Sequence, residues 1–269
     1  MPFTISHAAV VLPFARLLVR WRLLSAFVIG AMVPDFGLFF PWRMHRFETH
    51  SALALLTFCL PVGLATYWAF QYLIKAPMLE VLPEGAYARW RPFASPADFA
   101  SIRQWVLAGC GVLTGAVTHL VLDAFTHENA RGVRMIPWLE EPIVEIGNHH
   151  MAGIRLMQDG SSLFGLVVVL GLVLYGLRAG SESPVPHRPL GPLERRAWVA
   201  AYIVAVIGLS VAWLFWARIG EPVGRSYVAS ATRIAVAALR GLATALLFTS
   251  LALDGRLRAL GRRSAHRAP

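Results

Sequence analysis

One stretch of the chain carries metal-ligand side chains at helical spacing. Residues 115–127 read Gly-Ala-Val-Thr-His-Leu-Val-Leu-Asp-Ala-Phe-Thr-His, which places His119, Asp123 and His127 at intervals of four. Residues four apart stack on one face of an α-helix, one turn above the next. Imidazole nitrogens and a carboxylate oxygen are ligands that zinc, iron and manganese take. The stretch therefore predicts either a metal site or a cluster of polar groups at a helix end, satisfied by water and neighbouring loops.

The helix that positions these side chains has the composition of a membrane span. Residues 104–118 contain no charged side chain, so the polar face lies near the end of a long apolar helix. Ionisable groups are costly in that position unless they are paired or ligated. The whole chain has the same character, because 57% of its 269 residues are hydrophobic and only 15% are charged. This composition is typical of an integral membrane protein.

Five apolar runs are long enough to cross a bilayer. They cover about residues 52–74, 104–123, 160–177, 197–217 and 234–253. Before them, Ser6 is a candidate N-cap for a first helix. Residues 23–33 then form a shorter apolar run that breaks at Pro34-Asp35, which predicts a re-entrant or buried helix, with a full span as the alternative. We expect an all-α, polytopic membrane bundle of about five transmembrane helices plus N-terminal re-entrant or buried helices.

The chain shows no domain boundary and no internal repeat. We expect one membrane domain over residues 1–253, with the metal-site half at about 1–160 and a basic, disordered tail at 254–269. The net charge of +10 comes almost wholly from arginines that flank the apolar runs. Membrane lipids are therefore the expected partner, and nucleic acid is not. The N-terminus lacks the basic start of a signal peptide, and the arginine-rich tail favours a cytoplasmic C-terminus.

Further histidines and acids fall where alternating spans would bring them to the same membrane face. If the five spans alternate, residues 1–51, 124–159 and 218–233 share that face. The side chains on it or just beneath it include His7, Asp35, His45, His50, His119, Asp123 and His127. Thr49 or Ser51 can cap the span that follows His50.

Four motifs, in this order, match a known family: Ser6-His7, Pro34-Asp35, His45-Arg46-x-x-Thr49-His50-Ser51 and Thr118-His119-x-x-x-Asp123-x-x-Thr126-His127. Through them, about residues 1–180 resemble the DUF4184 family of bacterial membrane proteins. The chain is more distantly similar to the YdjM-like membrane-bound metal-dependent hydrolases and to the zinc-dependent phospholipase C and S1/P1 nuclease group. The resemblance implies a helical protein of the bacterial inner membrane that binds a divalent metal ion, zinc first. It also implies hydrolysis of a phosphoester in a lipid-like substrate.

The resemblance implies particular ligands as well. By position the implied metal ligands are His7, Asp35, His50, His119 and Asp123. His45 and His127 would either hydrogen-bond to these ligands or bind the metal as additional ligands. Where the YdjM-like pattern has a second acid two residues after Pro-Asp, this chain has Gly37. A site with more than one metal is therefore not implied for this chain.

The residues leave the catalytic groups and the function open. By type alone Glu48, Glu140, Glu141 and Glu145 are candidates for a general base, and nothing selects one of them. Arg46 and Arg131 are candidates for holding a phosphate. His149 and His150 are adjacent, so we interpret them as loop residues. The alternative to a hydrolase is a non-catalytic integral membrane protein in which the His/Asp cluster is structural. A transporter is a third interpretation, for which the spans after residue 160 offer only Arg240.

Overall fold

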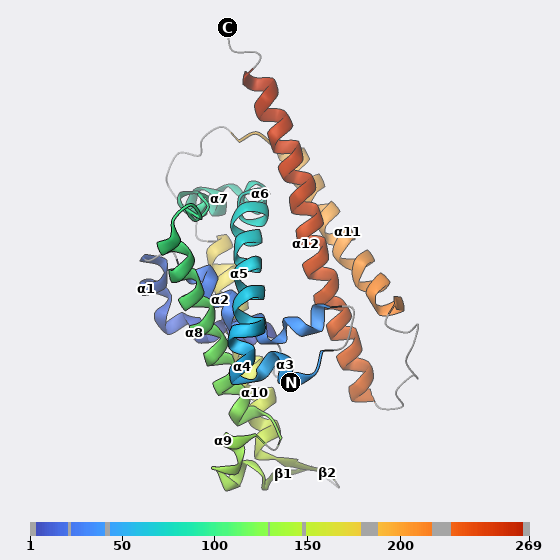
Figure 1. Ribbon diagram of the computed structural model, residues 1–269. Coiled ribbons are helices and arrows are strands. Elements are labelled where there is room, and N and C mark those ends of the chain that lie inside the picture. The colour runs from blue at the N-terminus through green and yellow to red at the C-terminus, as the bar shows by residue number, and fades with distance from the viewer. Residues whose placement is uncertain are drawn as a thin grey trace. The chain divides into compact units, whose positions relative to one another are not determined.

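The computed structural model (Figure 1) describes residues 4–20, 23–40, 44–128, 130–146, 149–178, 188–216 and 227–265. Contacts between residues divide the chain into two compact units. Unit 1 comprises residues 1–67 and 97–175, and unit 2 comprises residues 68–96 and 176–269. The two units are described separately below.

Five described helices are long and apolar enough to cross a membrane, which confirms the predicted fold class. They are Ala52–Glu80, Ile102–Thr126, Gly153–Arg178, Pro192–Trp216 and Arg233–Leu260. The first runs without a break through α4 (Ala52–Ala54), η3 (Leu55–Cys59), α5 (Leu60–Ala69), η4 (Phe70–Ile74) and α6 (Lys75–Glu80), of which η3 and η4 are π-helical. The others are α8 (Ile102–Thr126), α10 (Gly153–Arg178), α11 (Pro192–Trp216) and part of α12 (Tyr227–Ala265).

The surfaces of these helices are apolar. On α11 the side chains of Ile203, Val204 and Phe215 are each more than half exposed, and no residue of this helix is buried. Large exposed apolar surfaces are unfavourable in water and favourable against lipid chains. The chain is thus a helical membrane protein.

The N-terminal part of unit 1 consists of short helices: η1 (Thr4–Phe14), α1 (Ala15–Arg20), α2 (Leu24–Met32) and η2 (Val33–Phe39). The helix begins at Thr4, so Ser6 lies inside it instead of capping it. Pro34 lies in the first turn of η2, where the helix changes from the α to the 3-10 pattern. The apolar stretch Leu24–Phe39 is too short to count among the five spans, and most of α2 is buried, as the buried-helix prediction requires.

Glycines let α2 pack directly on the backbone of α8. A Cβ atom added at Gly30 would lie 2.2 Å from the Val112 carbonyl oxygen, and one added at Gly115 would lie 2.3 Å from the Phe27 carbonyl oxygen. Small residues at helix interfaces allow this close backbone approach within membranes. This contact fixes the position of α2 along the axis of α8. It therefore also fixes the position of Asp35, which follows α2, relative to His119 and Asp123 on α8.

The remaining elements of unit 1 are α3 (Arg46–His50), which leads into the first span, and a small extension after α8. The extension contains α9 (Arg131–Arg134), η6 (Pro137–Leu139) and the antiparallel strands β1 (Pro142–Ile146) and β2 (His149–Ala152), and it lies at the end of α8 beside the start of α10 (Figure 1). Val133, Leu139 and Ile154 form its small core. The sequence predicted an irregular loop here, so the hairpin is a difference from that prediction.

Unit 2 contains α6, α7 (Glu84–Trp90), η5 (Arg91–Phe93), α11 and α12. The helices α11 and α12 pack closely, since a Cβ atom at Gly241 would meet Ser210. Arg240, the charged residue within the last span, places its guanidinium 5.0 Å from the centroid of the Trp213 ring. This arrangement gives the charge a π partner on the neighbouring helix. The helix α12 continues to Ala265, so most of the basic segment that we expected to be disordered is helical, while residues 266–269 lie outside the described residues.

Candidate metal centre

Five polar side chains from four separate elements converge inside unit 1. They are His7 from η1, Asp35 from η2, His50 from the end of α3, and His119 and Asp123 from α8. All five are almost completely withdrawn from solvent: their side-chain exposures lie between 1% for His119 and 8% for His50. These are the five residues predicted as ligands, and the structure brings all of them together.

Each of two imidazoles faces both carboxylates. The His50 Nε2 atom lies 3.4 Å from Asp35 Oδ1 and 3.6 Å from Asp123 Oδ2. The His119 Nε2 atom lies 3.7 Å from each of the same two oxygens. His50 and Asp123, which alternating spans were expected to bring to the same membrane face, are therefore close neighbours.

These separations suit a shared cation better than direct hydrogen bonds. Charge-assisted N–H···O bonds are shorter, at about 2.7–2.9 Å. Two ligand atoms that are both ~2.0–2.2 Å from a tetrahedral zinc ion are about 3.3–3.6 Å apart. The four distances between imidazole nitrogens and carboxylate oxygens lie close to that spacing.

The hydrogen bonds behind the two rings orient their free nitrogens toward the carboxylates. His119 Nδ1 lies 2.8 Å from the Ala31 carbonyl oxygen, which can only accept, so this nitrogen carries the proton. The Thr49 hydroxyl oxygen lies 3.4 Å from the Arg46 carbonyl oxygen and 2.7 Å from His50 Nδ1, with which it shares a hydrogen bond. A neutral ring with its proton on Nδ1 presents the Nε2 lone pair to the carboxylate oxygens. Two facing lone pairs repel each other unless a cation or a proton lies between the nitrogen and the oxygen.

Buried polar atoms without a hydrogen-bond partner gather in this cluster. They are His7 Nδ1 and Nε2, His50 Nε2, His119 Nε2, Asp123 Oδ1 and His127 Nε2. A buried donor or acceptor that is left unsatisfied costs about 1–3 kcal/mol, so such atoms are rare in native proteins. Ligation of an ion would satisfy several of them at once.

The second oxygen of Asp123 faces a different pair of imidazoles. Asp123 Oδ1 lies 3.9 Å from His7 Nε2 and 3.3 Å from His127 Nδ1. The His7 ring stacks on the His119 ring with their centroids 3.9 Å apart. Burial, helped by the neighbouring His119, lowers the pKa of His7 to about 4, so its imidazole is neutral at neutral pH. A neutral imidazole is the form that binds a metal.

Two sets of three residues in this part of the structure meet the geometric requirement for holding an ion. His7, His119 and Asp123 form one, and Asp35, His50 and His119 form the other, with all ligand atoms of a set within 4.8 Å of one another. The two sets share His119, whose Nδ1 is already used by the Ala31 carbonyl. His119 therefore offers one nitrogen, which can complete only one of the two sets at a time.

Three residues that the sequence did not assign to the cluster surround it. The Thr4 hydroxyl donates to Asp35 Oδ2 over 2.8 Å, and Thr49 orients His50 as described above. Arg46 Nη2 donates to Asp123 Oδ2 over 2.7 Å, with a side chain that is 45% exposed. The spacing Thr4-x-x-His7, which puts both residues on one helix face, was the available signal for Thr4. Nothing in the sequence pairs Arg46 with a residue 77 positions away.

Other candidate residues have different roles or positions. His45 caps α3. Its Nδ1 accepts a hydrogen bond from the Phe47 amide, and the Glu48 carboxylate accepts one from the His45 amide. Both side chains are exposed and are used by the helix cap. Ser51 caps the first span by accepting from the Ala54 amide. Glu140, Glu141 and Arg131 are exposed. The side chains of Glu145, His149 and His150 lie outside the described residues.

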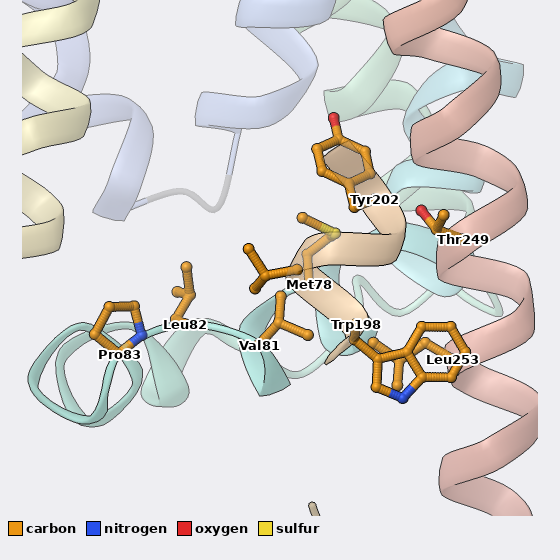
Figure 2. Close-up of a pocket in the computed structure, with 9 residues that line it drawn as sticks. Met78, Val81, Leu82, Pro83, Trp198, Tyr202, Thr249 and Leu253 are labelled. Carbon is orange, nitrogen blue, oxygen red and sulfur yellow. The ribbon is translucent and has the colours of Figure 1, made fainter. Parts of the chain in front are cut away.

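Unit 2 contains a separate cavity of about 220 Å³ (Figure 2). Its lining consists of Met78, Val81, Leu82, Pro83, Trp198, Val199, Tyr202, Thr249 and Leu253. This lining contains no carboxylate, imidazole or thiol and is mostly apolar, with hydroxyl groups from Tyr202 and Thr249. The His/Asp cluster of unit 1 is therefore the candidate functional site.

The fold and the cluster together define a helical membrane protein with a buried His/Asp site that could bind a metal ion. Residues 1–251 match the domain of unknown function DUF4184, and the chain belongs to this family. The match extends well beyond the first 180 residues that carried the resemblance and includes all five spans up to residue 251. No curated protein and no solved structure matches the chain.

Proposed function

We propose that this protein is a membrane-embedded, metal-dependent hydrolase that acts on a phosphoester of a lipid-like substrate. The observation that carries the proposal is the convergence of the His50 and His119 nitrogens on the oxygens of Asp35 and Asp123, at ligand–ligand spacing and without hydrogen-bond partners on the nitrogens. Two imidazole nitrogens and two carboxylate oxygens form a ligand set that is typical of zinc.

Each part of the cluster has a defined task in this proposal. His50, His119, Asp35 and Asp123 hold the ion, and His7 supports it from behind the His119 ring. Thr4, Thr49 and the Ala31 carbonyl orient the ligands. A bound zinc ion would lower the pKa of a water molecule and polarise a phosphoryl oxygen. His127 hydrogen-bonds through Nδ1 to the Asp123 carbonyl, which leaves its Nε2 available to accept a proton.

The position of the cluster along the helices supports a lipid-like substrate. Asp123 lies in the last turn of the span Ile102–Thr126, and His50 lies two residues before the span Ala52–Glu80. Consecutive spans run antiparallel, so the start of the first and the end of the second lie at the same membrane face. Lipid headgroups, with their phosphoesters, occupy that level of a bilayer.

The extent of burial favours a second candidate function, in which the metal is structural. The five ligands come from four elements and are nine-tenths or more buried, and closed zinc sites with four protein ligands are typically structural. In that case the ion would hold η1, η2 and α3 against α8 without catalysis.

Metal analysis of the detergent-purified protein tests the proposal. We expect about one zinc per chain in the wild type and in His45→Ala, whose imidazole only caps α3, and much less in His119→Gln and Asp123→Asn. Equal metal content in all four proteins would refute the assignment of these ligands. The metal-loaded and chelated proteins are then compared for phosphate release from phosphatidic acid in mixed micelles. If the protein binds stoichiometric metal but neither the metal-loaded nor the chelated protein releases phosphate, the result supports the structural role of the metal.

A further inference from the structure

Arg46 is the charged residue through which the buried cluster meets its surroundings. The five candidate ligands are at most 8% exposed and His127 is 17% exposed, whereas the Arg46 side chain is 45% exposed. Its guanidinium contacts the cluster directly, at Asp123 Oδ2. Among the described residues around the cluster, a ligand that arrives from outside therefore meets this guanidinium first.

The Asp123 oxygen that Arg46 contacts is one of the four atoms that surround the proposed ion position. An ion in that position shares the negative charge of Asp123 Oδ2 and weakens its hold on the guanidinium. The charge of the site also changes sign. Asp35, Asp123 and Arg46 together carry a net charge of −1 with neutral imidazoles, and a divalent cation raises this to +1. The metal-loaded site therefore favours an anion beside Arg46.

We propose that Arg46 is the anion-recognising residue of this site, and that metal binding releases it from Asp123 to hold a phosphate monoester beside the ion. The inference rests on the proposed metal centre and deepens it by naming the residue that selects the substrate class. A guanidinium suits this task because its planar array of donors matches phosphate oxygens in pairs.

The phosphate can belong to a lipid headgroup or to a free anion, and both share this chemistry. The probe is inorganic phosphate, titrated calorimetrically into full-length protein that has been loaded with zinc and freed of excess metal. Phosphatidic acid in phosphatidylcholine nanodiscs is the competitor. Competition identifies the lipid headgroup as an occupant, and its absence assigns the site to free phosphate.

The variants are Arg46→Ala, Arg46→Lys and, as a matched control, Arg103→Ala, which removes an exposed arginine of unit 1 in the first turn of α8, at the opposite end of that helix from Asp123. We expect Arg46→Ala to weaken phosphate binding roughly tenfold to a hundredfold, the range expected for hydrogen bonds to charged groups. Arg46→Lys keeps the charge but loses the paired donors, so its affinity falls in between. Arg103→Ala binds phosphate like the wild type.

Two further measurements separate this inference from the proposed metal centre. Zinc content in Arg46→Ala stays at the wild-type level, because Arg46 competes with the ion for Asp123 and does not ligate it. Chelated wild-type protein binds phosphate at least about tenfold more weakly than the zinc-loaded protein, as reciprocal coupling of the two ligands requires.

The outcomes are distinct. Wild-type phosphate affinity in zinc-loaded Arg46→Ala, or no phosphate binding by zinc-loaded wild type, overturns the role of Arg46 and leaves the metal centre standing. Absence of bound zinc in the wild type overturns the proposed metal centre, and with it the release of Arg46.

Discussion

Substitution of Gly115 by alanine tests how the fold positions the site. Gly115 lies on the face of α8 that meets α2, four residues before His119. The Cβ atom of an alanine would lie 2.3 Å from the Phe27 carbonyl oxygen, 2.6 Å from the Ala31 amide nitrogen and 2.8 Å from the Gly30 carbonyl carbon. All three neighbours are backbone atoms, so no side chain can rotate away to make room.

The distances set the size of the effect. Side-chain Cβ atoms essentially never lie closer than 3.0 Å to such atoms, so α2 must move away from α8 by about 0.7 Å or more. The same movement lengthens the 2.8 Å hydrogen bond between His119 Nδ1 and the Ala31 carbonyl beyond the usual limit of about 3.2 Å. Over-packing of this kind costs ~1–3 kcal/mol of stability. Loss of the hydrogen bond that orients a metal-ligating histidine typically reduces metal affinity by about 10- to 100-fold.

Two measurements on detergent-purified protein check this prediction. Thermal unfolding of the chelated protein reports the packing, and zinc titration against a competing chelator reports the affinity. Gly171→Ala is the matched control: Gly171 lies in α10, and an added Cβ atom would meet nothing within 4 Å. If Gly115→Ala unfolds at the wild-type temperature and binds zinc with wild-type affinity, then the close approach of α2 and α8 does not position the site.

Three further predictions concern other parts of the molecule. The pKa of His7 falls from its ordinary 6.5 to about 4, so folding favours the neutral ring. Its contribution to stability is complete above pH 6.5 and is lost progressively down to pH 4, about 3 kcal/mol in all, because each pKa unit corresponds to about 1.4 kcal/mol. In chelated protein, His7→Asn should remove this part of the pH dependence of unfolding, and an unchanged slope would contradict the assignment. In unit 2, Arg188 donates to the carbonyls of Leu79, Glu80 and Leu82 and stacks on the Tyr87 ring, so Arg188→Ala should lower the free energy of unfolding by about 2–4 kcal/mol, whereas exposed Arg196→Ala should leave it unchanged. Finally, a reporter fused after Leu253 should be cytoplasmic and one inserted within 124–159 external. Reporters on the same side would be incompatible with three spans between them.

The membrane fold could be predicted from the sequence because its signal is simple. A span requires only a sufficiently long run of weakly charged residues, and five such runs became the five long helices. The small extension after α8 lacks such a signal. Its two strands are five and four residues long, and the charged residues among them favoured a loop. The pair Gly147-Asn148 between two short stretches was the available hairpin signal, since these residue types favour tight turns.

The cluster was predictable as a set of residues but not as a set of contacts. The four-residue spacing placed His119, Asp123 and His127 on one face of α8, and in the structure both other side chains lie within 3.7 Å of Asp123. The groups that orient the ligands were not predictable in the same way. A backbone carbonyl such as that of Ala31 has no signature in the sequence, and the approach of α2 to α8 that brings it to His119 depends on three-dimensional packing. That the five residues bind a metal stays a proposal.

Pro34 links the local helix geometry at the end of α2 to the arrangement of the site residues. A proline has no amide N–H, so residue 34 cannot donate to the carbonyl of Ala31, three residues earlier, in the 3-10 pattern that begins at Val33. That carbonyl instead accepts the Nδ1 proton of His119 and fixes the ring with Nε2 toward Asp35. The same proline lies where α2 passes into η2, and Asp35 follows it at the buried start of η2. The change of helix type at Pro34 therefore supplies the site with one carboxylate and with the support of its central histidine.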